Sequence, residues 1–255
     1  MKNVLFFAAL AASGLLMPGC ASVGSDGKAR APESMRAAYY CPFSETALTV
    51  DGELSEPVWA QARTISFFIP VSFKAPVSKT EAKIAYDKNF LYVAFKAYDE
   101  DIWSLLTARD SATCNEDVLE IFFKTHPEKD PYFNFEINAL STVLDAYNLK
   151  RNAAGNYARW SQWNCAGLKM ISKVKGTVNN WTDRDECWIL EVAIPFASLP
   201  TLGGNPPVKG DKWLFNLARY DYSIYLPEGR ELTASAPLSK LDFHRYEDWN
   251  ALIFN

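Results

Sequence analysis

The sequence lacks the features that carry several common functions. It has no Cys-x-x-Cys pair of the kind that binds zinc, no glycine-rich phosphate loop and only two histidines, neither in a hydrolase motif. No basic stripe stands out, and the formal net charge of −4 argues against a nucleic-acid partner. Internal repeats and a second long apolar run are also missing. Because these motifs are missing, the function of the chain is expected to depend on its other polar and aromatic side chains.

The first 19 residues have the form of an export signal. Lys2 provides a short basic region, and residues 4–17 form an apolar run shorter than the roughly 20 residues that span a bilayer. The sequence LMPGC that ends at Cys20 resembles a bacterial lipobox, in which the cysteine is lipidated. Ordinary cleavage near residues 19–21 is the alternative. Both routes predict export, and lipidation predicts a membrane-anchored protein on the outer membrane or the periplasmic face.

The rest of the chain divides into a tether and one domain. Residues 20–38 are small, polar and without periodicity, which predicts a flexible tether. Residues 39–255 are long enough for one well-buried domain. An oxidising compartment would permit disulfides in this domain, and three pairings of its cysteines are open. These cysteines are Cys41, Cys114, Cys165 and Cys187.

Short apolar runs separated by turns predict an all-β protein. Many short strands at nearly regular spacing favour an antiparallel two-sheet β-sandwich of the immunoglobulin-like or jelly-roll type. Short helices are expected at residues 57–61 and 195–199. The expected strands are 47–50, 65–69, 81–86, 90–97, 116–124, 132–139, 142–147, 168–174, 187–194, 212–220 and 251–254.

One predicted strand carries an unusually polar face. Successive side chains of a strand point to opposite faces, so the run YFNFEINA at 132–139 places its apolar residues on one side. The other side carries Tyr132, Asn134, Glu136 and Asn138. These groups can hydrogen-bond hydroxyls. The face is therefore either the floor of a polar ligand site or an ordinary solvated surface.

The loop 125–131 predicts that this strand forms a hairpin with the run at 116–124. With symmetric pairing about the loop, Glu120 lies opposite Glu136 and Phe122 lies opposite Asn134. Opposed side chains in such a pair have Cβ atoms about 4.5–5.5 Å apart, so like charges repel. An arginine, a bound cation, a shared proton or ligand hydroxyls would have to offset this repulsion.

The order of motifs resembles family 9 carbohydrate-binding modules and their relatives, over roughly residues 42–255. The motifs are LTVDGELSEPVW at 48–59, AYDKNFLYV at 85–93, DVLE at 117–120, YFNFEIN at 132–138, WILEVAIP at 188–195, WLFNLAR at 213–219 and DFHR at 242–245. The resemblance implies a two-sheet sandwich that binds sugars, typically at chain ends, without cleaving them. It also implies that polysaccharide-degrading enzymes can be partners and that structural calcium can be present, although no dense Asp/Asn cluster identifies a calcium site.

The resemblance further implies which residues bind the sugar. Family members clamp it between two aromatic rings, and Phe243 matches one ring position while Cys114 stands at the other. Trp103, Trp160 or Trp163 could supply the missing ring, and Trp163 is preferred. Glu120 keeps the acidic position, whereas Glu136 stands where family members carry an arginine.

The expected carbohydrate-binding set has further members beside these carboxylates and rings. Arg219 could neutralise the glutamates, although strict alternation places it with the core residues of its strand. The full expected set is Glu120, Asn134, Glu136, Asn138, Trp163, Arg219, Phe243 and His244.

Three other functions remain open at this stage. Glu120 and Glu136 could serve a glycoside hydrolase or lyase, because retaining glycosidases hold two carboxylates about 5–5.5 Å apart. A structural envelope lipoprotein without a sugar ligand is a second alternative. Haem binding is a third, but the available methionines and histidines show no diagnostic spacing.

Overall fold

The computed structural model describes residues 22–23, 29–31 and 33–255. The expected signal segment and the lipidation residue Cys20 lie outside the described residues. Within them, no helix is long and apolar enough to cross a membrane.

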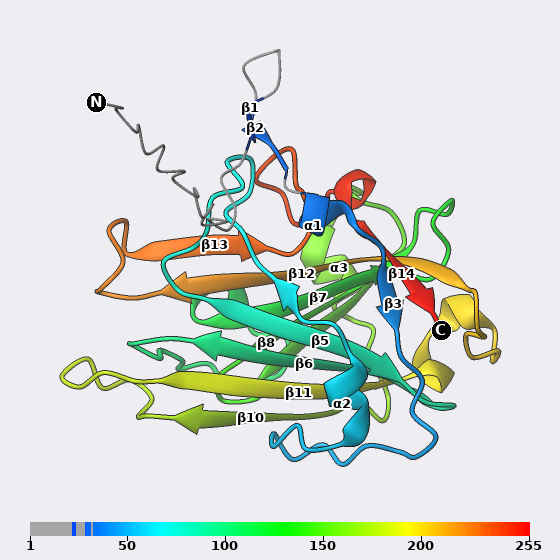
Figure 1. Ribbon diagram of the computed structural model, residues 1–255, viewed down its shortest axis with the longest axis horizontal. Helices are drawn as coiled ribbons and strands as arrows, with labels where there is room; N and C mark the ends of the chain where they lie inside the picture. The colour runs from blue at the N-terminus through cyan, green and yellow to red at the C-terminus, as the bar shows by residue number, and fades with distance from the viewer. Residues whose placement is uncertain (1–21, 24–28, 32) are drawn as a thin grey trace, which may run out of the picture.

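Two β-sheets are stacked as a sandwich (Figure 1). In the five-stranded sheet the order is β10 (Lys169–Lys175), β11 (Cys187–Pro195), β6 (Phe90–Tyr98), β5 (Thr80–Tyr86) and β4 (Ile65–Ser66). The order in the seven-stranded sheet is β3 (Tyr39–Cys41), β14 (Asn250–Phe254), β12 (Lys212–Tyr222), β7 (Val118–Lys124), β8 (Tyr132–Asn138) and β9 (Val143–Asn148), and β13 (Arg230–Ala234) also pairs with β12. All these pairs are antiparallel except β14 with β3. The predicted all-β sandwich is confirmed.

The remaining elements are short. They are β1 (Ser22–Val23), β2 (Ala29–Arg30), the α-helices α1 (Glu33–Arg36), α2 (Pro57–Gln61) and α3 (Asn156–Trp160), and 3-10 turns at Thr113–Asn115, Phe196–Ser198, Pro200–Leu202 and Tyr246–Asp248. The helix expected at 57–61 is confirmed as α2, and a 3-10 turn lies within the one expected at 195–199.

The main core lies between the two sheets and follows the alternation of the strands. In β8 the buried core residues are Phe133, Phe135 and Ile137, and β7 adds Leu119, Ile121 and Phe123. The residues between them point to the outer face of the seven-stranded sheet. That outer face is therefore where Glu120, Asn134 and Glu136 lie.

A second, smaller core explains two of the sequence motifs. Trp59 of α2 packs with Tyr92 and Ala94 on the outer face of the five-stranded sheet. The Glu191 carboxylate accepts the backbone N–H groups of Asp51 and Gly52, both at 3.0 Å. The DGELSEPVW and WILEVAIP motifs therefore hold a loop onto this sheet, on the side of the molecule away from the polar face.

The prediction of a strand at 47–50 is wrong. Backbone N–H groups in this segment donate to side chains and not to a partner strand. The Leu48 N–H donates to the Tyr92 hydroxyl at 3.2 Å, and the Thr49 N–H donates to Glu56 at 3.0 Å. Conversely, β3 and β13 were not expected. Both are short strands that depend on pairing: β3 pairs with β14, and β13 pairs with β12.

Part of the expected tether packs against the domain. Ala31 and Met35 are buried and form a small cluster with Phe73, and Phe68 packs against it. Ala31 and Met35 are thus in contact with the sandwich.

The described cysteines form no disulfide. Cys41, Cys165 and Cys187 are buried and free, and Cys114 is free and partly exposed. The two sheets are therefore held together by packing and polar contacts.

Candidate functional site

The two glutamates of the hairpin face each other as the sequence predicts. Cα pairing in the β7–β8 ladder joins Glu120 with Glu136 and Phe122 with Asn134. Both carboxyl groups lie on the outer face of the sheet, yet only 3% of Glu120 and 8% of Glu136 is exposed. The register prediction is confirmed, and the pair is buried as well as opposed.

The surroundings of the pair disfavour its ionisation. Burial raises the pKa of Glu136 to about 6, although hydrogen bonds from Asn134 (2.9 Å) and Thr113 (3.3 Å) oppose the shift. Burial and the neighbouring Glu136 raise the pKa of Glu120 well above its ordinary value. In the described part of the chain, Glu120 Oε2 and Asn134 Oδ1 are buried without a hydrogen-bond partner. Polar atoms in this state are available to a ligand.

A cleft of about 410 Å³ opens above the pair. Its aromatic walls are Tyr220 and Phe243, and the two glutamates form part of its lining. The other lining residues are Ala112, Cys114, Leu144, Leu232, Leu241, Asp242 and His244. The size and the mixture of apolar walls with a few polar groups are typical of a small-molecule site.

A second hollow of about 260 Å³ shares Glu136, Leu144, Asp242 and His244 with this cleft. It continues along β8 and β9 past Asn134 and Asn148 to Trp160. Together the two spaces form one groove on the outer face of the seven-stranded sheet. We call this space the acidic groove.

The two expected clamp positions face the same cleft. Phe243 and Cys114 both line it, so the geometry of the resemblance holds while one ring is absent. Tyr220 packs edge-on against Phe243 with ring centroids 5.4 Å apart. The structure thus provides a second aromatic wall from a residue that the sequence did not single out.

His244 is a neutral polar wall of the groove. Burial lowers its pKa, and its Nδ1 lies 2.8 Å from the Tyr132 hydroxyl. Its backbone N–H donates to Asp242 at 3.0 Å. His244 therefore lines the groove, and its role in binding stays a prediction.

Asn138 is not part of the groove, although it shares a face with Glu136. Its amide group donates to Leu106 O at 2.8 Å and to Glu116, while its oxygen accepts the N–H groups of Leu140 and Thr142. All of its hydrogen-bonding capacity is used to hold a turn. The expectation that Asn138 binds ligand is corrected accordingly.

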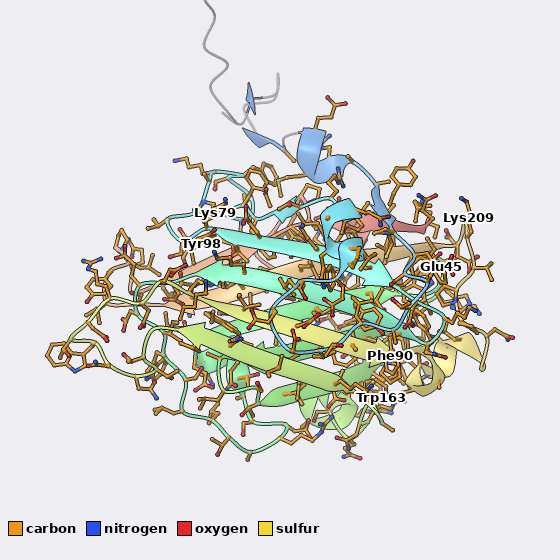
Figure 2. The ribbon with its side chains drawn as sticks, turned by 60° about the horizontal axis from the view of Figure 1, so that its bottom comes forward. Glu45, Lys79, Phe90, Tyr98, Trp163 and Lys209 are labelled. Atoms are coloured by element: carbon orange, nitrogen blue, oxygen red, sulfur yellow. The ribbon has the colours of Figure 1, made fainter. Side chains whose placement is uncertain are left out.

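Trp163 is also misplaced by the sequence-based prediction. The ring of Trp163, which is labelled in Figure 2, packs on Phe133, Phe135 and Tyr147. These three residues belong to the inner side of the sheet. The loop that carries it turns toward the core, a path that local sequence does not determine. Trp160 lines the acidic groove instead.

Arg219 lies inside the sandwich and does not reach the glutamates. Its neighbour Ala218 pairs with Glu120, so alternation sends Arg219 to the inner face. There it contacts Asp99 at 2.7 Å and Asp221 at 3.2 Å, and donates to Thr80 and Tyr98 O. The proposed neutralisation of Glu120 and Glu136 by Arg219 is wrong.

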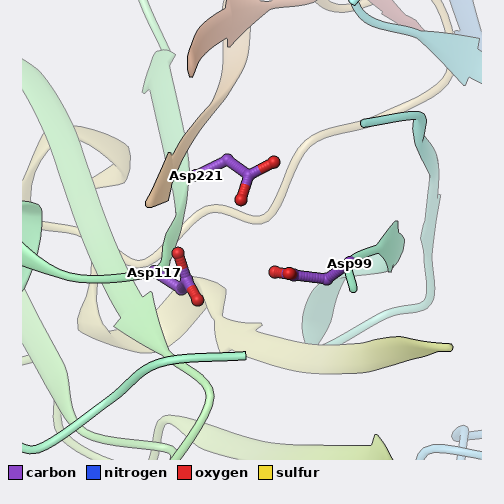
Figure 3. Close-up of side chains that lie close together, drawn as sticks. All are labelled: Asp99, Asp117 and Asp221. Carbon is purple, nitrogen blue, oxygen red and sulfur yellow. The ribbon is translucent and has the colours of Figure 1, made fainter. Parts of the chain in front are cut away.

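Around Arg219 the structure assembles an acidic cluster that the sequence did not reveal. The carboxylates of Asp99, Asp117 and Asp221 point toward one another (Figure 3), with ligand atoms within 4.8 Å. Asp117 accepts the N–H groups of Trp103 and Tyr222, whereas both Asp221 oxygens are buried without a hydrogen-bond partner in the described part of the chain. Three carboxylates face one guanidinium, so the donor set and the excess negative charge fit a hard cation such as calcium.

The sequence also missed several residues of the acidic groove. Tyr220 could have been found, because alternation along its strand places it opposite to Arg219. Asp242 comes from a loop and Trp160 from the short helix α3, and the placement of both depends on tertiary packing.

Comparison with known proteins agrees with this architecture. Residues 50–224, more than half of the chain, match the family model described as Carbohydrate family 9 binding domain-like. A search of curated proteins gives no match.

Solved structures share the fold at low sequence identity. A candidate carbohydrate-binding protein from Bacteroides uniformis ATCC 8492 has 15% identity and a TM-score of 0.61, with 85% of this chain and 98% of that chain covered. A family 9 carbohydrate-binding module from Caldicellulosiruptor kristjanssonii in complex with cellotriose has 14% identity and a TM-score of 0.58, covering 85% and 93%. The same type of module from that organism in complex with glucose has 14% identity and a TM-score of 0.54, covering 85% and 94%. These likenesses show the fold, and the family match shows that the chain belongs to the carbohydrate family 9 binding domain-like family.

Proposed function

We propose that this chain is a non-catalytic carbohydrate-binding lipoprotein that captures sugars or polysaccharide chain ends at the cell envelope. The observation that carries the proposal is the convergence of Glu120, Phe243 and the Cys114 position on one cleft. Phe243 is far from the other two in the sequence, and each position matches a sugar-contacting position in the family resemblance. The sugar complexes of the similar Caldicellulosiruptor modules support the same class of ligand.

The acidic groove has the groups that a sugar requires. Tyr220 and Phe243 provide apolar ring surface, which can stack on the C–H face of a pyranose. Asn134 Oδ1 and Glu120 Oε2 are buried and unpartnered in the described residues, so they can accept hydrogen bonds from hydroxyls. His244 adds a neutral polar group at the wall.

The cellular location of the protein is inferred from its first residues. The export signal and the lipobox-like sequence ending at Cys20 support anchoring at the outer membrane or the periplasmic face. A binder anchored there would hold polysaccharide fragments near the enzymes that degrade them. We propose such enzymes as its partners.

A structural calcium ion is part of the proposal. The Asp99, Asp117 and Asp221 carboxylates would hold it, because they supply oxygen ligands and an excess of buried negative charge. The ion would stabilise the domain and take no part in sugar contact, since the cluster lies on the inner side of the sheet.

The glycoside hydrolase alternative retains one observation in its favour. Glu120 and Glu136 are directly opposed, and two carboxyl groups about 5–5.5 Å apart are typical of retaining enzymes. The family is one of binding domains, which favours binding over cleavage.

A glycan array combined with an assay for released sugars tests the proposed function. Wild-type protein should bind at least one glycan class and release no product from the polysaccharides it binds. Tyr220→Ala and Asn134→Ala should each weaken that binding at least tenfold, because each removes a wall or an acceptor of the acidic groove. Trp181→Ala is the control, since Trp181 is 68% exposed and does not line the groove. Product release would support the hydrolase, and absence of any glycan ligand would support a structural lipoprotein.

A further inference from the structure

The acidic groove carries negative charge that the described residues do not balance. The lining of its main cleft contains Glu120, Glu136 and Asp242 but no lysine or arginine. Arg151 lines the adjoining hollow, where its guanidinium binds Glu247 at 2.6 and 2.8 Å and His244 O at 3.0 Å. Its charge is therefore already engaged.

The other groups that face the glutamates do not supply positive charge. Cys114 lies beside them, and burial together with the two glutamates raises the pKa of its thiol to about 11. Tyr220 is a neutral phenol, because burial and nearby acids raise its pKa. His244 is neutral, since burial lowers its pKa. Thr113 and Asn134 are hydrogen-bond donors without charge.

A neutral sugar can hydrogen-bond through its hydroxyls to one carboxylate and to a protonated partner. It adds no positive charge beside the buried pair, so ionisation of both glutamates stays unfavourable. An ammonium group offers up to three N–H donors and a positive charge at the same place. Charge-assisted hydrogen bonds to carboxylates are stronger than neutral ones.

We propose that the acidic groove prefers a sugar that carries a protonated amine, with the ammonium at Glu120 and Glu136 and the sugar ring against the aromatic wall of Tyr220 and Phe243. This inference rests on the proposed sugar-binding function and names the class of sugar.

Calorimetric titration with matched ligands tests the inference. Glucosamine oligosaccharides, N-acetylglucosamine oligosaccharides of equal length, cello-oligosaccharides and putrescine are compared at pH 6.5. The amino-sugar oligomer should bind at least tenfold tighter than its acetylated counterpart and than putrescine.

Isosteric variants then locate the preference. Glu120→Gln and Glu136→Gln should each reduce the ratio of amino-sugar to neutral-sugar affinity at least fivefold, while Glu128→Gln on the exposed hairpin loop leaves it unchanged. Unaltered circular dichroism of each variant excludes misfolding as the cause.

The outcomes separate this inference from the proposed function. Equal or tighter binding of cello-oligosaccharides would overturn the amine preference and leave sugar binding intact. Putrescine binding as tightly as the amino sugar would overturn recognition of a sugar at the charged pair. Absence of binding by every saccharide here and on the glycan array would overturn both.

Discussion

Single side chains in this domain are held in states that their neighbours impose. Glu120 and Glu136 face each other below the protein surface, and Asn134 donates to one of them. Because two buried carboxylates repel, the folded protein holds a proton at this pair more tightly than the unfolded chain does. Protonation of one glutamate and binding of a ligand are thus two ways of relieving the repulsion between Glu120 and Glu136.

The pH dependence of stability should show this contact directly. The pKa of Glu136 in the folded protein is about 6, above its ordinary value of 4.5. Tighter binding of this proton by the folded state stabilises the protein fully below pH 4.5, and the stabilisation is lost as the pH rises through 6. Glu120→Gln removes the group whose own pKa burial and Glu136 raise well above its ordinary value. In the free protein it should raise the unfolding free energy at pH 8 by more than about 1.4 kcal/mol, the equivalent of one pKa unit.

Urea denaturation between pH 4.5 and 8 measures the effect, with Glu128→Gln as the exposed control. The difference between Glu120→Gln and wild type should shrink toward pH 4.5. A difference that is constant across this range would contradict the coupling of the two glutamates.

The loops at one end of the sandwich are linked by hydrogen bonds, and together they position the start of β7. Asp185, in the β10–β11 loop, accepts the Ile102 N–H at 2.8 Å and the Thr177 N–H at 2.6 Å. The Trp103 N–H in turn donates to Asp117 at 2.6 Å, directly before β7. The placement of Glu120 on β7 therefore depends on a chain of backbone contacts through this end.

Gly176→Ala should disrupt this end more than an ordinary glycine substitution does. Gly176 has φ +144°, and an added Cβ would overlap the Asp185 carboxylate. The expected loss of unfolding free energy is about 3 kcal/mol, because the backbone is strained and a buried carboxylate is displaced from its donors. Gly229→Ala is the matched control. It has φ +70° with nothing within 4 Å of the added Cβ, so about 1 kcal/mol is expected.

Chemical denaturation of the two variants gives both numbers under the same conditions. Equal losses would show that Asp185 moves aside freely and that the loop contacts contribute little.

At the scale of the whole molecule, the two sheets are joined by charge as well as by apolar packing. Arg219 of the seven-stranded sheet donates to Thr80 and to Tyr98 O of the five-stranded sheet, and pairs with Asp99 beyond the end of β6. Removing one partner of such a buried pair typically costs about 3–5 kcal/mol. This junction has no disulfide beside it, because the described cysteines are free.

Calcium should stabilise the whole domain through this junction. A cation at 100 times its dissociation constant would add about 2.7 kcal/mol. For a domain of this size, that corresponds to a rise in Tm of roughly 5–10 °C. Calorimetry of the EDTA-treated protein, with and without calcium, measures the shift.

Asp221→Asn should abolish the calcium response, while Asp183→Asn, outside the cluster, should retain it. An identical Tm in EDTA and in calcium for the wild type would show that the cluster holds no stabilising calcium ion.

The sequence predicted what depends on local alternation and failed where tertiary packing decides. The register of Glu120 and Glu136 follows from a symmetric loop and period-two patterning, both visible in the sequence. Asp99, Asp117 and Asp221 meet only because the two sheets stack, so no spacing could identify them. Trp160, at the end of the short helix α3, faces the groove, whereas Trp163 in the following loop faces the core. This segment has little periodicity, which explains why the wrong ring was preferred.

The pairing of β3 with β14 has a consequence for the timing of folding. The strand nearest the beginning of the sandwich hydrogen-bonds in parallel with the last strand, and the Asn255 N–H donates to Cys41 O at 3.0 Å. Contacts between such distant segments form slowly, because a long loop must close first. The seven-stranded sheet therefore cannot be completed before β14 has been synthesised. Until then, β3 has no partner strand in this sheet.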